Sequence, residues 1–507
     1  MWQLINNPSD HPLATLKSAR KLLVNLPKDD TVIFLQEISH WVVAIHDQEN
    51  EFKLNHQLEL LRLLDETAHV HIVQTMSKYF STQALSDFQS NRMWTTLKEY
   101  FTCTAEAYLS LVRSHRNGVK KSASLKQYMP LITARAMHAL GGRLKLAAVR
   151  YEAVAPEVWL KLAELYAYAE AQEFLDEHFS LYEGYGADTT VRNILAGMAM
   201  WQACGKGTLK PVQIHIAEHL VHHLDAHLTI DEHYVPGSLM TFDLRRGRAP
   251  MRMDSEATVH PGLRFIGVAS APQHLRNLIS KLVKGSIPDE LELKADYSAA
   301  VILEVAQHLA RGISSAPPVR RDTRRRVSVN LCVASGLSRL DELASHRSRD
   351  CETGESWDTE DISSNGFLCV LPAGNSSNVK IGELIGLQPE KMLRWGAGIV
   401  KRLSHDSKNN LLIGVEMLSN QITGVTLHDD KIKSGIGRGV QRALYLNKPE
   451  IKNEEAWLLM KPDGYSGAQT LAMTMEDKDY LLVPLELLKQ GDDYVLARFR
   501  KLEHGLR

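Results

Sequence analysis

Five arginines within seven positions are the side chains of this chain whose type and spacing point most clearly to chemistry. They follow the dipeptide Pro317-Pro318 and give two overlapping R-x-x-x-R spacings: Arg320, Arg321, Arg324, Arg325 and Arg326. A guanidinium fork binds phosphate through paired hydrogen bonds, and it also pairs with the O6/N7 edge of guanine. The alternative is a solvated basic linker or a nonspecific nucleic-acid tether, because charge runs commonly stay hydrated.

A second polar segment, Asp361 to Gly366, lies just before an apolar run that predicts a strand. The Asp361 carboxylate can accept hydrogen bonds from the N1–H and the amine of a guanine, and the Ser363 hydroxyl can serve a phosphate or a base. Gly366 permits a tight turn with a close backbone approach. Taken alone, the segment also fits an ordinary serine turn that opens a strand.

In this order and within a β-rich frame, the two segments together resemble the PilZ domain family. The R-x-x-x-R pattern of the family matches Arg321 to Arg325, its [D/N]-x-S-x-x-G pattern matches Asp361 to Gly366, and the resemblance covers about residues 319–420. It implies a small antiparallel β-barrel that binds cyclic di-GMP without a catalytic residue, a metal ion or a further cofactor. The ligand contacts that it implies are Arg320, Arg321, Arg324, Arg325, Asp361, Ser363 and Gly366.

Cyclic di-GMP has two phosphates and two guanines, so its site needs cations, guanidinium forks and an acceptor for a guanine edge. Before ligand arrives, the crowded arginines should repel one another, and the anionic ligand should order them against the barrel. We therefore expect a receptor, not an enzyme, in which binding moves the helical half relative to the barrel.

One feature departs from the family pattern. The segment between the two motifs is longer than expected, and the excess covers Asp341 to Glu360, a polar and partly acidic stretch that includes Cys351 and Trp357. We expect an inserted loop there, which could cover the site or dock elsewhere.

A competing signal is the H-x-x-E-H pattern over residues 215–219. On a helix, His215 and His219 could both face a zinc ion, with Glu218 nearby as a general base, as in a zinc-dependent hydrolase. The other interpretation is a histidine-rich polar face beside an apolar stripe. The surrounding sequence predicts a helical array and contains no further protease signature, which favours the polar face.

The composition excludes several broad classes. The chain has 507 residues, and its 59 basic and 60 acidic residues leave a formal net charge of −1, so no bulk field draws it to nucleic acid or to an anionic membrane. The five scattered cysteines form no C-x-x-C pair, which argues against a disulfide framework or a zinc ribbon. We find no secretory signal and no run of about 18 apolar residues that could span a membrane. The expected compartment is the reducing cytoplasm.

Hydrophobic periodicity divides the chain into four regions. Apolar residues recur every three or four positions through residues 1–230, which predicts an α-helical array, loosely similar to tetratricopeptide repeats, that serves a protein partner. Residues 231–313 predict a small mixed α/β segment. Short strands separated by turn residues then predict the barrel with its arginine linker over 314–420 and a terminal β-rich unit over 421–507.

The sequence thus predicts a multidomain α+β protein with an all-α N-terminal array, a PilZ-like antiparallel barrel and a terminal β-rich unit. The expected function is that of a cytoplasmic bacterial receptor for cyclic di-GMP. Two alternatives remain open: a zinc-dependent hydrolase built on residues 215–219, and a scaffold whose degenerate barrel no longer binds nucleotide.

Overall fold

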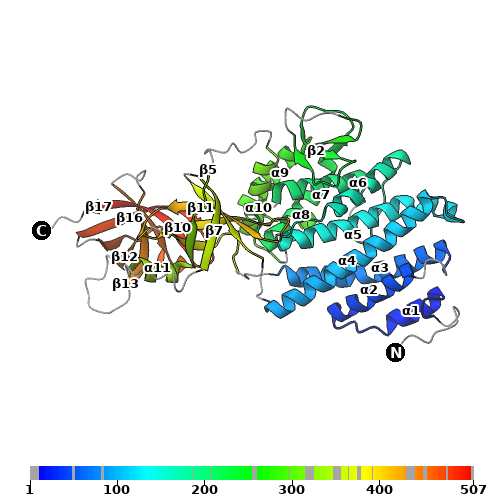
Figure 1. The fold of residues 1–507 in the computed structure, drawn as a ribbon, viewed down its shortest axis with the longest axis horizontal. Helices are drawn as coiled ribbons and strands as arrows, with labels where there is room; N and C mark the ends of the chain where they lie inside the picture. The colour runs from blue at the N-terminus through cyan, green and yellow to red at the C-terminus, as the bar shows by residue number, and fades with distance from the viewer. Residues whose placement is uncertain are drawn as a thin grey trace. The chain divides into compact units, whose positions relative to one another are not determined.

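The chain folds into two compact units, Met1–Pro318 and Val319–Arg507. The first unit is helical with one small sheet, and the second is built mainly of β-strands (Figure 1). This confirms the predicted fold class, whereas the finer division into four domains stays a prediction. The computed structural model describes residues 11–47, 52–81, 85–186, 188–205, 207–253, 260–294, 296–314, 325–345, 355–363, 365–373, 378–390, 392–429, 440–448, 454–475 and 478–503.

Helices α1 to α8 form most of the first unit. Several begin where local sequence signals predict a start. Ser86 and Gln89 cap α4 reciprocally, and Pro156 and Pro211 stand in the first turns of α6 and α8. The bounds are α1 Leu16–Val24, α2 Thr31–Asp47, α3 Leu54–Tyr79, α4 Asp87–Arg116, α5 Met129–Val149, α6 Pro156–Ala171, α7 Val191–Gly205 and α8 Pro211–His222.

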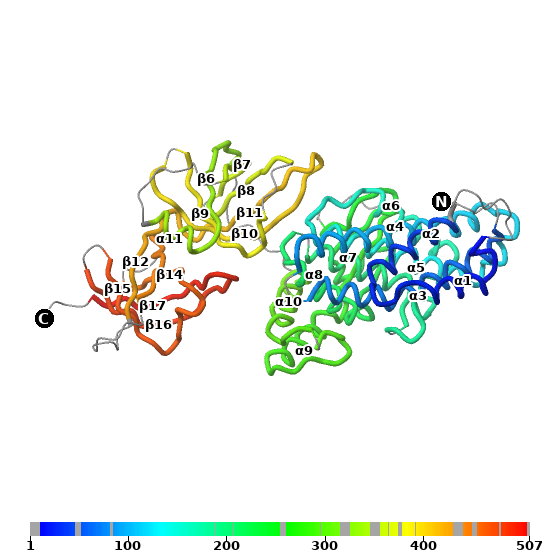
Figure 2. The backbone as a smooth tube through the Cα atoms, turned by 90° about the horizontal axis from the view of Figure 1, so that it is seen from below, coloured from blue at the N-terminus to red at the C-terminus, as the bar shows by residue number. Residues whose placement is uncertain are grey.

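The helices pack around one apolar core. Helix α2 contacts α3 and α4, α4 contacts α5, and α5 in turn contacts α6, α7 and α8 (Figure 2). The core includes large aromatic side chains that are fully buried, among them Tyr100, Tyr108, Trp159 and Tyr166. Burial of such side chains is the main source of stability for a helical unit of this kind.

A small sheet and two more helices complete the first unit. The sheet has the order β1-β4-β2-β3, and α9 packs against α10, which also contacts α7 and α8. Their side chains belong to the same core as those of the preceding helices. The bounds are β1 Thr229–Asp231, β2 Ser238–Asp243, β3 Met251–Arg252, β4 Leu263–Gly267, α9 Ala271–Val283 and α10 Ala299–Gly312.

The first barrel of the second unit is a closed ring with one short strand added at its rim. The strand order is β5-β7-β6-β9-β10-β11-β8, and an additional pairing of β7 with β8 closes the ring. Strands β5 and β6 follow each other along one edge of β7, because each pairs with a different part of it. The bounds are β5 Arg325–Arg326, β6 Asn330–Ser335, β7 Glu355–Ser363, β8 Gly366–Leu371, β9 Leu384–Pro389, β10 Gly396–His405 and β11 Leu411–Ser419.

The prediction of an inserted loop over Asp341 to Glu360 is wrong at both ends of this range. Its first residues complete helix α11 (Leu337–Ser345), and its last residues form most of β7. The middle part, residues 346–354, lies outside the described residues. Strand β7 is polar enough to resemble a loop, yet its buried side chains, Trp357 and Thr359, alternate with exposed ones.

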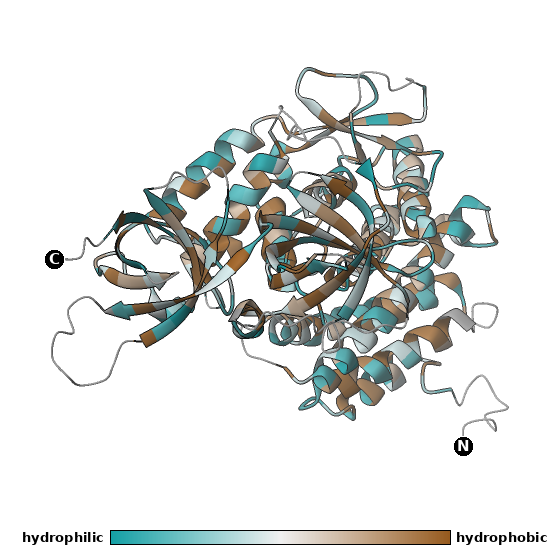
Figure 3. Cartoon of the chain, turned by 60° about the vertical axis from the view of Figure 1, so that its left-hand side comes forward, coloured by the Kyte–Doolittle hydropathy of each residue, from teal (hydrophilic) through white to brown (hydrophobic). Residues whose placement is uncertain are grey.

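The second barrel confirms the predicted terminal β-rich unit. It is closed, with the strand order β12-β13-β14-β17-β16-β15. Hydrophobic and hydrophilic residues both occur along the strands of the two barrels (Figure 3). Helix α11 packs on β6 and β9 of the first barrel and on β12 and β13 of the second. The bounds are β12 Ile422–Asp429, β13 Val440–Leu446, β14 Glu455–Met460, β15 Leu471–Met475, β16 Lys478–Gln490 and β17 Val495–Glu503.

Candidate functional site

The described end of the arginine segment lies beside the acidic serine-glycine segment. Strand β5 pairs antiparallel with β7, and the register places Arg325 opposite Ile362 and Arg326 opposite Asp361. Directly opposed residues of an antiparallel pair put their side chains on the same face of the sheet. The two segments, separated by more than thirty positions in the sequence, therefore meet at one rim of the first barrel.

The register also shows which arginine shares a face with Asp361. Of the two arginines in the described part of the segment, it is Arg326, which is not among the predicted contacts, whereas Arg325 shares the face of Ile362. The period-two alternation of a strand could have identified Arg326, had the sequence revealed that this segment forms a strand. Arg320, Arg321 and Arg324 lie outside the described residues, and their role stays a prediction.

The three predicted residues of the second segment surround the β7–β8 turn. Ser363 pairs with Gly366, and its hydroxyl donates a hydrogen bond to the Gly366 carbonyl over 3.3 Å. Gly366 is needed for a close backbone approach, because a Cβ there would lie 2.3 Å from the carbonyl oxygen of Val415. The glycine therefore allows β8 to pair with β11, and it keeps Asp361 and Ser363 in place at the rim.

Replacing Gly366 by alanine is expected to destabilise the second unit by about 1–3 kcal/mol, because β8 or β11 must shift to admit the methyl group. Denaturant unfolding, followed by the fluorescence of the buried Trp357, measures this change. Gly467→Ala is the matched control, since its Cβ would meet only the Tyr465 hydroxyl at 3.9 Å. Equal stability of the Gly366→Ala variant and the wild type would contradict the described backbone approach.

An ion-pair group borders this rim and ties the two barrels together. The Lys489 Nζ on β16 lies 2.7 and 2.8 Å from the two carboxyl oxygens of Glu416 on β11, and the Lys401 Nζ lies 3.4 Å from one of them. Burial acts to raise the pKa of Glu416, but the two ammonium groups outweigh it and hold that pKa below its usual range. Glu416 is the register partner of Gly366, so this group adjoins the predicted site.

Replacing Lys489 by alanine is expected to raise the pKa of Glu416, because burial still opposes ionisation while the stronger partner is lost. In the wild type, the lowered pKa means that ionised Glu416 stabilises the fold above the ordinary value of 4.5, and that this contribution is lost as the pH falls through the folded-state pKa. Carboxyl-carbon NMR during a pH titration measures the shift. Lys478→Ala, on the same strand, should leave it unchanged, and an unaltered pKa in Lys489→Ala would argue against the ion pair.

The H-x-x-E-H residues surround a lysine. The Lys145 Nζ is 2.8 Å from the Nδ1 of His215 and also contacts the Glu218 carboxylate. Burial lowers the pKa of His215, and it lowers that of His219 to about 4. An ammonium group in contact with one of the two ligand candidates and with the candidate base opposes the approach of a second cation. No cluster suited to a metal ion occurs among the described side chains. The geometry favours a buried polar cluster over a zinc centre.

A second buried polar cluster lies in the core of the helical unit and was not predicted. The Asp65 carboxyl accepts hydrogen bonds from the hydroxyls of Tyr100, Tyr108 and Tyr182 at 2.6, 2.8 and 3.1 Å, and the Arg135 Nη1 lies 3.4 Å away. Burial, reinforced by the neighbouring carboxyl, raises the pKa of all three tyrosines, so each hydroxyl keeps the proton that it donates. The cluster joins α3, α4 and α5, and its groups are directed at one another.

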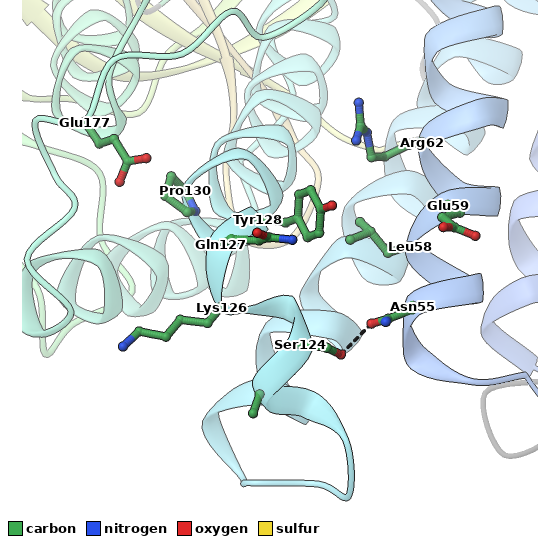
Figure 4. A pocket seen from close by; sticks show the side chains of 11 residues that line it. Asn55, Leu58, Glu59, Arg62, Ser124, Lys126, Gln127, Tyr128, Pro130 and Glu177 are labelled. Carbon is green, nitrogen blue, oxygen red and sulfur yellow. Dashed lines mark hydrogen bonds between the residues drawn. The ribbon is translucent and has the colours of Figure 1, made fainter.

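The surface of the helical unit has a groove of about 840 Å³ between the start of α3 and the short helix Ser122–Tyr128 (Figure 4). Arg62 and Lys126 line it together with Glu59 and Glu177. Its mixed charge gives no uniform field for a doubly charged anion. The groove is therefore a poor candidate for a ligand with two phosphates.

Comparison with known families finds a match to the N-terminal part of the chain. Residues 17–234 match the family model described as the N-terminal domain of the cyclic-di-GMP receptor FimW. No curated protein matches the chain. The matched range lies within the first unit and contains neither the arginine segment nor either barrel. Of the helices in the described part of the chain, none is both long and apolar enough to cross a membrane.

Proposed function

We propose that this protein is a receptor for cyclic di-GMP, that its first barrel is of the PilZ type, and that the ligand binds at the rim where β5 meets β7. The observation that supports this most directly is the register that sets Arg326 opposite Asp361. The family match concerns the other unit, and its description names a receptor for the same ligand. Two separate parts of the chain therefore point to one ligand.

Each group at the rim has a distinct role in this proposal. The predicted arginines and Arg326 bind the phosphates and the guanine Hoogsteen edges through their forks. Asp361 accepts from the Watson–Crick edge of a guanine, and Ser363 and Gly366 shape the wall beside it. The Ser363 hydroxyl donates to a backbone carbonyl, so it is not poised as a nucleophile next to a base. We therefore propose binding without turnover and without a further cofactor.

The position of the arginine segment suggests how binding could be transmitted. This segment follows the last helix of the first unit and leads directly into the first barrel of the second. A ligand that fixes the arginines against β7 would restrict the connection between the two units, and the helical unit would present the altered state to a protein partner. A reducing cytoplasm fits the cysteines of the described chain, Cys103, Cys204, Cys332 and Cys369, which are free thiols.

Calorimetric titration of the full chain with cyclic di-GMP tests the proposal, with cyclic di-AMP and GTP as controls. We expect saturable binding of cyclic di-GMP and at least tenfold weaker binding of both controls. Cyclic di-AMP retains the phosphates but lacks the guanine edges, and GTP has a single guanine. Absence of cyclic di-GMP binding would refute the proposal and favour a scaffold with a degenerate barrel.

A further inference from the structure

A single row of residues crosses five strands of the first barrel, β5, β7, β8, β11 and β10. The register sets Arg326 opposite Asp361, Asp361 opposite Leu368, Leu368 opposite Gly414, and Gly414 opposite Arg402. Opposed residues in antiparallel strands share a face, so the whole row lies on one side of the sheet. With strands about 4.8 Å apart, the backbones of Asp361 and Arg402 are separated by roughly 14 Å.

The row lies on the outer face of the barrel. The residues that alternate with it, Cys369, Ile413 and Leu403, are buried in the interior. Arg402 is exposed, and Leu368 and Gly414 are partly exposed. The row is thus accessible to a ligand that lies flat on the barrel wall next to the β5–β7 rim.

Gly414 leaves the middle of the row without a side chain. A Cβ at this position would lie 3.1 Å from the Cβ of Arg402, which shows independently that both residues face the same way. Glycine within a strand often marks a site where a ligand approaches the backbone closely. Leu368 and Gly414 therefore form a low apolar floor between the carboxylate of Asp361 and the guanidinium of Arg402.

Arg402 is available for such a contact. No hydrogen bond or ion pair of its side chain occurs within the described ranges of the chain, although other exposed arginines of this unit, such as Arg339 and Arg442, are paired. The guanidinium of Arg402 can therefore turn toward a ligand that lies on the row. An exposed fork facing a flat floor suits the edge of a planar base.

We propose that Arg402 donates to the O6/N7 edge of a guanine that lies over Leu368 and Gly414, while Asp361 accepts from the N1–H and the amine of the same base. This inference rests on the proposed function and identifies the residue that sets base specificity. Adenine presents an amine donor where guanine presents O6, so it offers Arg402 one acceptor in place of two. A site that reads both edges of the base in this way excludes adenine dinucleotides.

The test compares the wild type with Arg402→Ala in calorimetric titrations of the full chain. Arg394→Ala is the matched control, because Arg394 is an exposed arginine in the turn before β10. We expect Arg402→Ala to weaken cyclic di-GMP binding roughly 10- to 100-fold and Arg394→Ala to leave it unchanged. Arg402→Lys, which keeps the charge but lacks the fork, should remain weaker than the wild type.

An analogue of cyclic di-GMP shows which edge of the guanine Arg402 contacts. Cyclic di-GMP with 7-deazaguanine bases lacks N7, so Arg402→Ala should cost clearly less affinity with this analogue than with cyclic di-GMP. An equal loss with both ligands, full affinity of Arg402→Lys, or full affinity of Arg402→Ala would overturn the assignment of Arg402. If the wild type itself fails to bind cyclic di-GMP, the proposed function is wrong and this inference falls with it.

Discussion

Replacing Asp65 by alanine is expected to destabilise the helical unit by about 3–5 kcal/mol, because the change leaves a buried guanidinium and three buried hydroxyls without their common acceptor. Asp65 is fully buried and Arg135 is 2% exposed. Arg135 would keep its bonds to Glu66 and to the Leu181 carbonyl, at 2.8 and 3.1 Å, which limits the loss. Hydrogen exchange of the α4 and α5 amides should then accelerate by roughly two to four orders of magnitude.

Two further variants show whether the loss of stability comes from this buried polar cluster or would follow from removing any polar or charged side chain. Tyr182→Phe removes one hydroxyl donor and should cost only about 1 kcal/mol, since Asp65 retains its other partners. Asp289→Ala breaks an ion pair whose side chains are 66% and 86% exposed, and it should change stability by less than about 0.5 kcal/mol. If Asp65→Ala were no more damaging than Asp289→Ala, the cluster would have no role in holding the helices together.

The strands were predictable wherever apolar and turn residues alternate along the sequence. Residues 366–371, 411–419 and 440–446, for example, form strands within the two regions for which the sequence predicts short strands separated by turns. Strand β7 was missed because its exposed side chains are polar and its buried Thr359 is polar as well. Residue propensities and apolar alternation do not predict a strand such as β7, because its conformation is determined by the neighbouring strands with which it pairs and not by its own composition.

The two candidate binding segments and the Asp65 cluster differ in how far a sequence can reveal them. The segments are short local patterns, so the sequence predicted their chemistry, and the register then showed which arginine faces Asp361. The Asp65 cluster unites side chains 35, 43, 70 and 117 positions away from it, with no pattern between them. Only the packing of α3, α4 and α5, together with the segment between α6 and α7 that contains Tyr182, brings these groups together. Periodicity gives no information about which polar residues of separate elements meet.

Replacing Arg321 and Arg325 together by alanine is expected to weaken cyclic di-GMP binding by roughly 10²- to 10⁴-fold. Each charge-assisted hydrogen bond to a phosphate or a guanine edge contributes about 1.5–3 kcal/mol, and the double variant removes at least one such contact at each position. Arg325 pairs with Ile362 through backbone groups, which alanine retains, so the β5–β7 pairing should survive. Calorimetry measures the affinity, and thermal unfolding verifies that the fold is intact.

A loss of two positive charges would by itself weaken the binding of any dianion, so the control must remove the same charge elsewhere. Arg394 and Lys408 are exposed in turns of the same barrel, and Arg394→Ala with Lys408→Ala matches the change in net charge. This pair should lower the affinity only slightly, and more at low than at high salt, because distant exposed charges act through a screened field. Contacts by the arginine forks predict the opposite pattern, a large loss that persists at high salt. Equal losses in the two double variants would mean that the arginine segment attracts the ligand only by its charge and makes no specific contact with it.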